Sequence, residues 1–176
     1  MVRREVPLDA RRILHALAEH RVDYLVIGGL AVQAHGHVRT TQDVDLLPDP
    51  TPENLDRLAA TLRSLRARPA GEGPRPDFQL DAAAILATDP LSLDTGAGGV
   101  DVHRSPSGGQ PFAVMRRRAL TIEVVGLRVP VVGRDDLIAM KRAAGRPVDR
   151  GDVIALTEVE VTELRERGSR PVVDRK

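Results

Sequence analysis

The sequence predicts an α+β domain in which amphipathic helices pack on a β-sheet, and three observations favour this class. Apolar residues at helical spacing alternate along the chain with short apolar runs typical of strands. Two pairs of these runs flank glycine turns, as the strands of a β-hairpin do. With 176 residues, the chain can bury one core of ordinary size and is short for two domains. We therefore expect one domain over residues 1–157, followed over 158–176 by a C-terminal helix and a tail that is disordered after Gly168.

The predicted helices are marked by apolar residues three and four positions apart. In residues 8–21 the apolar face consists of Ile13, Leu14, Leu17 and Ala18. Further helices are expected over residues 30–35, from a Thr51 cap through 65, over 80–86, over 112–119, from an Asp135 cap through 142, and from about 149.

The predicted strands are short runs bounded by glycine or proline. Residues 24–27 form an apolar run that ends at a glycine pair, which is typical of a buried strand followed by a tight turn. A second strand is expected over residues 41–47, closed by Pro48. Two hairpins are expected, the first pairing 91–94 with 100–103 and the second pairing 120–125 with 127–132. Residues 67–77 are rich in proline, glycine and charge, and predict an exposed loop.

Two aspartates on the second strand are the first sign of chemistry. Asp43 and Asp45 are separated by one residue, so their side chains point to the same face, roughly 6 to 7 Å apart along the strand. Two carboxylates so close repel each other unless a cation or a donor lies between them. Carboxylate oxygens are hard ligands that suit Mg²⁺. The pair therefore predicts a magnesium site.

A glycine turn and a third acid accompany this pair. Gly28 and Gly29 follow the first strand and open a short helix, and backbone N–H groups at such a helix start form an anion site that a phosphate can approach closely. Asp101 lies between two valines of the first predicted hairpin, so it faces away from the core if the valines face it. In a site of this kind, metal ions activate an attacking hydroxyl and stabilise a leaving oxygen.

Composition excludes several other classes. The chain has no cysteine, so it can form neither a disulfide framework nor a thiolate metal site. It has three aromatic residues, which argues against base-stacking platforms for single-stranded nucleic acid. No apolar run approaches the length of a membrane span or a signal peptide, so we expect a soluble cytoplasmic protein without a membrane partner.

The combination of glycine pair, Asp-x-Asp and later acid resembles the nucleotidyltransferase superfamily, which has the DNA polymerase beta-like fold. Residues 28–47, GGLAVQAHGHVRTTQDVDLL, and 136–153, DLIAMKRAAGRPVDRGDV, are also similar to the AbiEii-like branch. That branch includes toxins of toxin–antitoxin pairs, and related small transferases modify antibiotics. The resemblance spans residues 10–157. It implies a nucleotidyltransferase fold with a mixed β-sheet, helices packed on it and a short helical C-terminal part.

The resemblance also implies functions for individual residues. Asp43 and Asp45 would bind Mg²⁺ and the triphosphate of an NTP, and Asp101 would complete the metal site and act toward the acceptor hydroxyl. Gly28 and Gly29 would hold the phosphates. Second-rank candidates for nucleotide binding are Arg39, Thr41 and Lys141.

For other polar residues a functional role is less strongly indicated. For Lys141, a solvated helix lysine explains the sequence about as well as a contact to the nucleotide does. His35, His37 and His103 could flank the site, but their spacing gives no standard zinc ligand set. Structural partners at a helix junction are the better interpretation of Arg146, Asp149 and Asp152.

The predicted activity is Mg²⁺-dependent transfer of a nucleoside monophosphate from an NTP to an acceptor hydroxyl, with release of pyrophosphate. Residues 115–176 carry 14 basic and 10 acidic side chains, against 12 and 15 in residues 1–114, which slightly favours RNA, especially the 3′ end of tRNA, as acceptor. An antibiotic is the rival acceptor, and a catalytically idle binding or regulatory module is the alternative of another class. The chain lacks the long C-terminal domain of many AbiEii-like proteins, so an antitoxin protein or a second copy of the chain is an expected partner.

Overall fold

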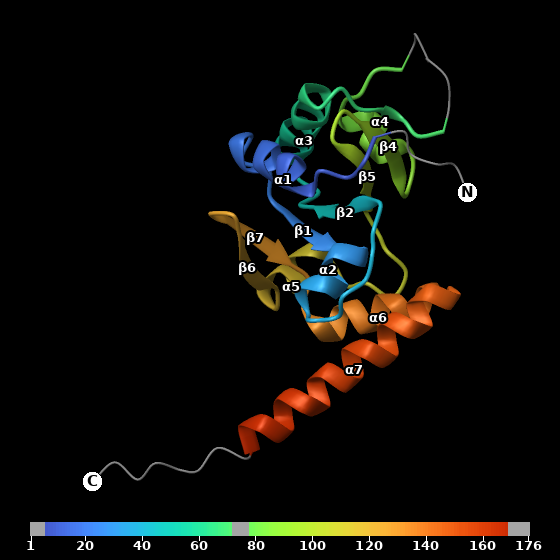
Figure 1. Cartoon of the computed structure of the whole chain (residues 1–176). Coiled ribbons are helices and arrows are strands. Elements are labelled where there is room, and N and C mark those ends of the chain that lie inside the picture. Colours follow the sequence, from blue (N-terminus) through green and yellow to red (C-terminus); the bar gives the residue numbers. More distant parts are fainter. Residues whose placement is uncertain (1–5, 72–77, 169–176) are drawn as a thin grey trace.

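The computed structural model describes residues 6–71 and 78–168, with side chains up to residue 158 (Figure 1). Expectations for residues 72–77 of the loop and for the tail after Gly168 lie outside this part of the chain.

One mixed β-sheet forms the centre of the described chain, with the strand order β3-β4-β5-β2-β1-β7-β6. Strands β1 and β7 run parallel, as do β2 and β5, and the other neighbours are antiparallel. The α+β class and the mixed sheet are therefore confirmed. The strands are β1 Tyr24–Ile27, β2 Asp43–Pro48, β3 Arg68–Pro69, β4 Leu91–Thr95, β5 Gly98–Val102, β6 Leu120–Val124 and β7 Leu127–Val131.

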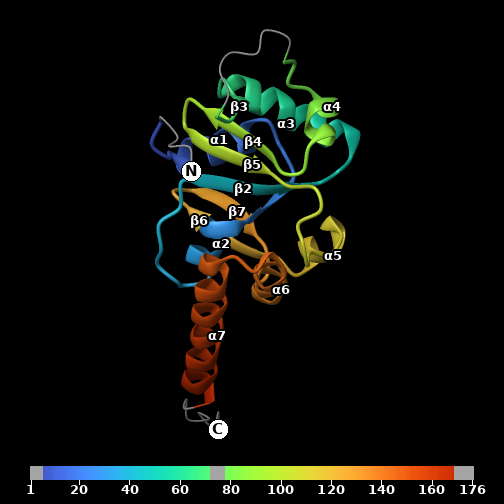
Figure 2. The ribbon, with the colours of Figure 1, turned by 90° about the vertical axis from the view of Figure 1, so that its right-hand side faces the viewer.

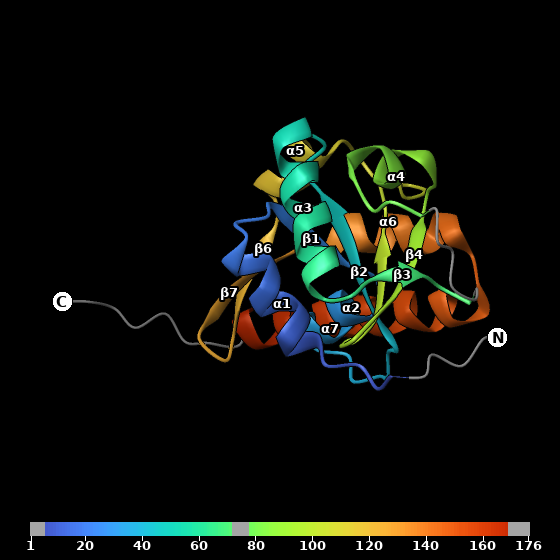
Figure 3. The ribbon, with the colours of Figure 1, turned by 90° about the horizontal axis from the view of Figure 1, so that it is seen from above.

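Helices cover both faces of the sheet (Figures 1 and 3). Helices α1, α3 and α4 lie on one face, and α2, α6 and α7 lie on the other. Beyond its first turns, α7 projects away from the sheet (Figure 2). The helices are α1 Ala10–Glu19, α2 Gly28–Ala34, α3 Pro52–Ser64, α4 Ala82–Ala87, α5 Phe112–Arg117, α6 Arg134–Ala144 and α7 Pro147–Gly168.

The core is aliphatic and lies mainly between the sheet and the α1/α3 layer. The apolar face of α3 is buried at Leu55, Leu58, Ala59 and Leu62, and so is the C-cap residue Leu65. Strand β2 shows why one face carries the chemistry: Val44 and Leu46 are fully buried, whereas Asp43 and Asp45 alternate with them toward the other face and are only half-buried. The core therefore fixes which way the two acids point.

Several local expectations were wrong in detail. On α1, Ile13, Leu14 and Leu17 are buried as expected. The fourth buried position is Ala16 and not Ala18, which is exposed. The cap of α6 is Gly133, and Asp135 lies inside the first turn. Thr51 is the N-cap residue of α3, but its side chain makes no capping hydrogen bond.

Near the proposed domain end, only the start of the last helix differs from expectation. Helix α6 ends at Ala144, and its C-cap residue Gly145 has a φ of +64°, the left-handed conformation that glycine tolerates best. Helix α7 begins at Pro147, two residues before the expected start, and runs without a break past residue 157. No helix in the described part of the chain has both the length and the apolar character that a membrane span needs.

Candidate functional site

Asp45 and Asp101 are register partners on neighbouring parallel strands. Strands β2 and β5 pair in parallel, with Asp45 opposite Asp101 and Asp43 opposite Gly99. Adjacent strands lie about 4.8 Å apart, and opposed residues point to the same face. All three aspartates are half-buried. The structure thus brings Asp45 and Asp101 directly together and places Asp43 one step along the same face.

The glycine turn lies against these acids. Gly28 has a φ of +62°, and a Cβ atom there would stand 1.8 Å from Asp45 Oδ2. A Cβ atom on Gly29 would stand 2.5 Å from Thr41 Oγ1 and 2.7 Å from Arg39 Nη2. Both positions therefore require glycine, because backbone and polar side chains approach each other too closely for any larger residue. Helix α2 starts at the first of them, two residues earlier than expected.

His103, directly after β5, contacts Asp45. Its Nε2 lies 3.0 Å from Asp45 Oδ1. Burial lowers the pKa of His103, but the hydrogen bond and charge of Asp45, together with the charges of Asp101 and Asp89, outweigh it and raise the pKa above the usual value. His103 therefore takes up a proton more readily than a histidine without such acidic neighbours.

The same contact acts on Asp45 in the opposite sense. Burial raises the pKa of this carboxyl, but the hydrogen bond and charge of His103, a hydrogen bond from the Gly29 backbone and the charge of Lys141 lower it overall. Asp45 is therefore held as a carboxylate. A carboxylate that is ionised and only partly covered can accept a cation.

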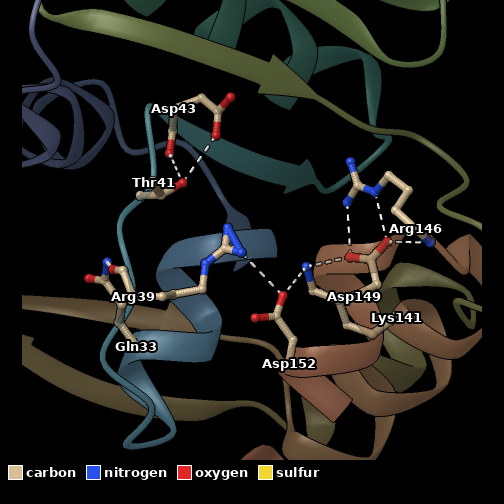
Figure 4. Close-up of polar contacts among 8 residues, drawn as sticks. All are labelled: Gln33, Arg39, Thr41, Asp43, Lys141, Arg146, Asp149 and Asp152. Atoms are coloured by element: carbon tan, nitrogen blue, oxygen red, sulfur yellow. Dashed lines mark hydrogen bonds and ion pairs between the residues drawn. The ribbon is translucent and has the colours of Figure 1, made fainter. Parts of the chain in front are cut away.

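Thr41 supports the first acid of the pair. Its hydroxyl donates to Asp43 Oδ1 at 3.2 Å (Figure 4), and the same hydroxyl oxygen would stand 2.5 Å from a Cβ atom on Gly29. This contact fixes the orientation of one Asp43 oxygen. Thr41 thus contacts an acid of the site, although it was expected only as a contact to the nucleotide.

Lys141 is buried, which excludes the interpretation as a solvated helix lysine. Only 5% of the residue is exposed, and its Nζ lies 2.9 Å from Asp149 Oδ1 and 2.9 Å from Asp152 Oδ2. Arg146 Nε donates to Asp149 at 2.7 Å, and Arg39 Nη1 lies 3.2 Å from Asp152 (Figure 4). These five residues form one ion-pair network that joins the α2–β2 loop, α6 and α7.

The ion-pair network lowers the pKa of the Asp149 carboxyl. Burial raises the pKa of its carboxyl, but hydrogen bonds from Arg146 and Lys141 outweigh it and lower the pKa to about 2. The sequence correctly suggested Arg146, Asp149 and Asp152 as partners at a helix junction. It missed that they surround Lys141, because nothing local marks which lysine a buried carboxylate will meet.

A cleft of about 350 Å³ opens beside Asp45. Its polar wall contains Gly28, Asp45, His103, Lys141 and Arg146. Its apolar wall consists of Leu137, Met140 and Ala144, which lie on one side of α6. Asp89, which the sequence did not suggest, also lines it. The cleft has the size of a small-molecule site and reaches the acids from the His103 side.

The acids fit Mg²⁺ in the chemistry of their oxygen atoms. Asp43, Asp45 and Asp101 offer the oxygen ligands that this ion prefers, on one face of two neighbouring strands. As they stand, no three acidic or histidine side chains of the described residues converge closely enough to form a metal-binding group. One oxygen of Asp45 is engaged by His103. Metal binding therefore requires these side chains to turn toward one another. His35 does not belong to the site: it is buried, and its Nε2 lies 2.8 Å from the Val132 carbonyl oxygen.

No protein-family model and no curated protein sequence matches the chain. Among solved structures, it is similar to the lincosamide antibiotic adenylyltransferase LnuA in its lincomycin-bound form, with a TM-score of 0.61 and 14% identity over 87% of this chain and 99% of that chain. It is also similar to ANT(2'')-Ia in complex with adenylyl-2''-tobramycin, with a TM-score of 0.54 and 18% identity over 91% and 97% of the two chains. An antigenic nucleotidyltransferase-like protein from Paracoccidioides brasiliensis gives a TM-score of 0.54 and 19% identity over 88% and 79%.

These likenesses establish the fold. The chain has the nucleotidyltransferase fold, with a mixed sheet, packed helices and a helical C-terminal part, as expected. At 14 to 19% identity they show nothing narrower. The AbiEii-like branch therefore stays a prediction.

Proposed function

We propose that this protein is a Mg²⁺-dependent nucleotidyltransferase, which moves a nucleoside monophosphate from an NTP to an acceptor hydroxyl and releases pyrophosphate. The observation that carries the proposal is the register of Asp45 with Asp101, two carboxylates of distant sequence segments that meet on one face beside the Gly28 turn. Two half-buried like charges at this spacing are costly without a cation between them. The fold shared with adenylyltransferases supports the same reaction.

In this proposal each group has one task. Asp43, Asp45 and Asp101 hold Mg²⁺, which when bound offsets the charge of the triphosphate and of the leaving oxygen. The Gly28–Gly29 turn brings backbone close to the phosphates, with Arg39 beside Gly29 and Lys141 in the cleft that Gly28 lines.

The transfer itself makes one bond and breaks one. The acceptor oxygen bonds to the α-phosphorus, the bond from that phosphorus to the bridging oxygen breaks, and pyrophosphate leaves with the electron pair. In this proposal Asp101, the register partner of Asp45, accepts the hydroxyl proton. The strands hold these groups rigidly, and a misplacement of about 1 Å can cost about a hundredfold in rate.

The test is transfer of label from NTPs to candidate acceptors. We expect Asp45→Asn and Asp101→Asn each to lower transfer by about a hundredfold or more. Asp23→Asn is the matched control, because Asp23 lies at the opposite end of β1 and pairs with Arg116 at the surface. Transfer that survives both site substitutions would sink the proposed site. Calorimetry tests the idle-module alternative, which predicts that the unaltered protein does not bind NTP·Mg²⁺.

The cleft favours a small-molecule acceptor over RNA. Its described lining combines an apolar wall with three aspartates, a lysine, an arginine and a histidine, and it includes no phenylalanine, tyrosine or tryptophan on which a base could stack. An acidic pocket, which a polycationic aminoglycoside would require, is not what these residues form. We therefore expect a weakly charged hydroxyl compound. Mass spectrometry after incubation with lincosamides, aminoglycosides and tRNA distinguishes the three acceptor classes by the mass that gains a nucleotide.

A nucleotidyltransferase of this kind could also serve as the toxin of a toxin–antitoxin pair. It predicts that expression arrests growth of a host and that Asp43→Asn relieves the arrest. Growth that is unaffected by the unaltered protein would remove the toxin role while leaving the transferase activity open to the label-transfer assay.

A further inference from the structure

Asp152 on α7 joins two cations that lie close to the candidate phosphate site. Its Oδ2 lies 2.9 Å from Lys141 Nζ and 3.2 Å from Arg39 Nη1, and its side chain is 2% exposed (Figure 4). Arg39 precedes β2 by several residues, Lys141 lies on α6, and Asp152 lies 113 residues from Arg39 in sequence. A single oxygen therefore ties three segments together.

This contact is poorly explained by stability alone. Burying a carboxylate with its cations costs about as much as the pairing returns, and such groups are often replaceable by apolar residues without loss. Lys141 also already has a buried partner in Asp149. The second buried partner, Asp152, limits the positions that the flexible ammonium group of Lys141 can take.

The two cations that Asp152 holds both face the Gly28–Gly29 turn. The Nη2 of Arg39 would stand 2.7 Å from a Cβ atom on Gly29. Lys141 lines the cleft beside Gly28 and acts electrostatically on Asp45. Asp152 itself is not part of the cleft lining. It therefore reaches the site only through its two partners.

Arg39 has one N–H donor that makes no hydrogen bond within the described residues. Its Nε is buried and has no hydrogen-bond partner among the residues that the structure describes. A buried N–H without a partner is costly, and such atoms commonly await a ligand or a water. A phosphate oxygen beside the turn is an acceptor of the right charge for a guanidinium.

We propose that Asp152 is a positioning residue for the triphosphate: by holding Arg39 and Lys141 close to the Gly28–Gly29 turn, it places both cations to bind the β- and γ-phosphates of the NTP. The inference rests on the proposed nucleotidyltransferase function. It adds that the first turns of α7 determine phosphate affinity, although none of Asp43, Asp45 and Asp101 lies on that helix.

The test compares nucleotides that differ in phosphate number. In Asp152→Asn we expect the Kd for NTP·Mg²⁺ to rise about tenfold, while the Kd for the corresponding monophosphate changes less than about twofold. The matched control is Asp136→Asn, which removes another buried carboxylate of the same helical layer, one that pairs with Arg118 at 3.1 Å. Both variants are monitored by thermal unfolding, so that a loss of folded protein is recognised separately from a loss of affinity.

Selective loss of triphosphate affinity is the result that the proposal requires. Equal weakening of triphosphate and monophosphate binding, or the same change in Asp136→Asn, would make Asp152 merely structural and overturn it. If Asp152→Asn does not fold, Arg39→Gln takes its place, because Arg39 is part of a loop and is 21% exposed. That variant must also lose triphosphate affinity selectively, and wild-type affinity overturns the proposal. If both variants fold, their effects on triphosphate affinity must be less than additive, because they act through the same contact.

These outcomes remain distinct from failure of the proposed function. If the unaltered protein binds no NTP·Mg²⁺, the nucleotidyltransferase proposal itself fails. If it binds NTP·Mg²⁺ and Asp152→Asn binds it equally well, only the positioning role fails.

Discussion

Gly28 lies so close to the carboxylate of Asp45 that a methyl group on its Cα would stand 1.8 Å from Asp45 Oδ2. The glycine turn and the acid are therefore one structural unit, although 16 residues separate them in the sequence. The acid keeps its orientation only while the turn carries no side chain.

Gly28→Ala should lower transfer by about a hundredfold, because the new Cβ displaces Asp45 from its place beside Asp101. The matched control is Gly126→Ala, in the β6–β7 turn. Gly126 has a φ of +78°, similar to the +62° of Gly28, but a Cβ there meets nothing within 4 Å. Both variants should lose about 1 to 2 kcal/mol from backbone strain. Equal activity in the two, measured by label transfer, would contradict the prediction.

Tyr24 should titrate far above the usual range for tyrosine. Burial raises its pKa to about 12, against about 10 in an unfolded chain. Since the neutral phenol is favoured in the folded state, its contribution of about 2 to 3 kcal/mol is complete below about pH 10 and is lost as the pH rises through about 12. Tyr24 is the one tyrosine of the chain, and there is no tryptophan, so tyrosinate absorbance reports this residue alone. A midpoint near 10 in folded protein would contradict the burial.

Asp149 should make the protein sensitive to acid. Its pKa is about 2 when folded and about 4 when unfolded, so its contribution to stability, on the order of 2 kcal/mol, is present above about pH 4 and is lost as the pH falls to about 2. Asp149→Asn should cost about 3 kcal/mol at neutral pH, because it leaves Arg146 and Lys141 short of a buried acceptor. Urea unfolding of both proteins at several pH values measures this. If the difference between them stays constant from neutral pH to about pH 2, the assignment to Asp149 is wrong.

His103→Ala should raise the pKa of Asp45. The substitution removes the hydrogen bond and the positive charge that lower this pKa, whereas the burial that raises it largely remains. Carboxyl chemical shifts of ¹³C-labelled aspartate, followed against pH, report the change. His15→Ala is the control, because His15 pairs with Glu19 at an exposed position of α1. An unchanged Asp45 pKa in His103→Ala would mean that the 3.0 Å contact has little electrostatic effect.

Local pattern was enough for most of the secondary structure. The apolar run 24–27 became β1 within its predicted bounds, and the hairpin around residues 95–99 formed as expected. Such features depend on the alternation of a strand or the spacing of a helix, which neighbours in sequence determine. The errors lie at element ends, as at Asp135 and Ala18, where packing against distant residues chooses between adjacent positions.

For the candidate site, the sequence by itself determined that Asp43 and Asp45 share a face and that a glycine turn comes shortly before them. It also supplied Asp101 as a third acid, but only the parallel pairing of β2 with β5 put Asp101 opposite Asp45. The burial of Lys141 between Asp149 and Asp152, the link to Arg39 and the contact of His103 with Asp45 were likewise decided by tertiary structure. The physical reason is that the direction of a side chain follows from local backbone geometry, whereas its partners depend on which segments the core brings together.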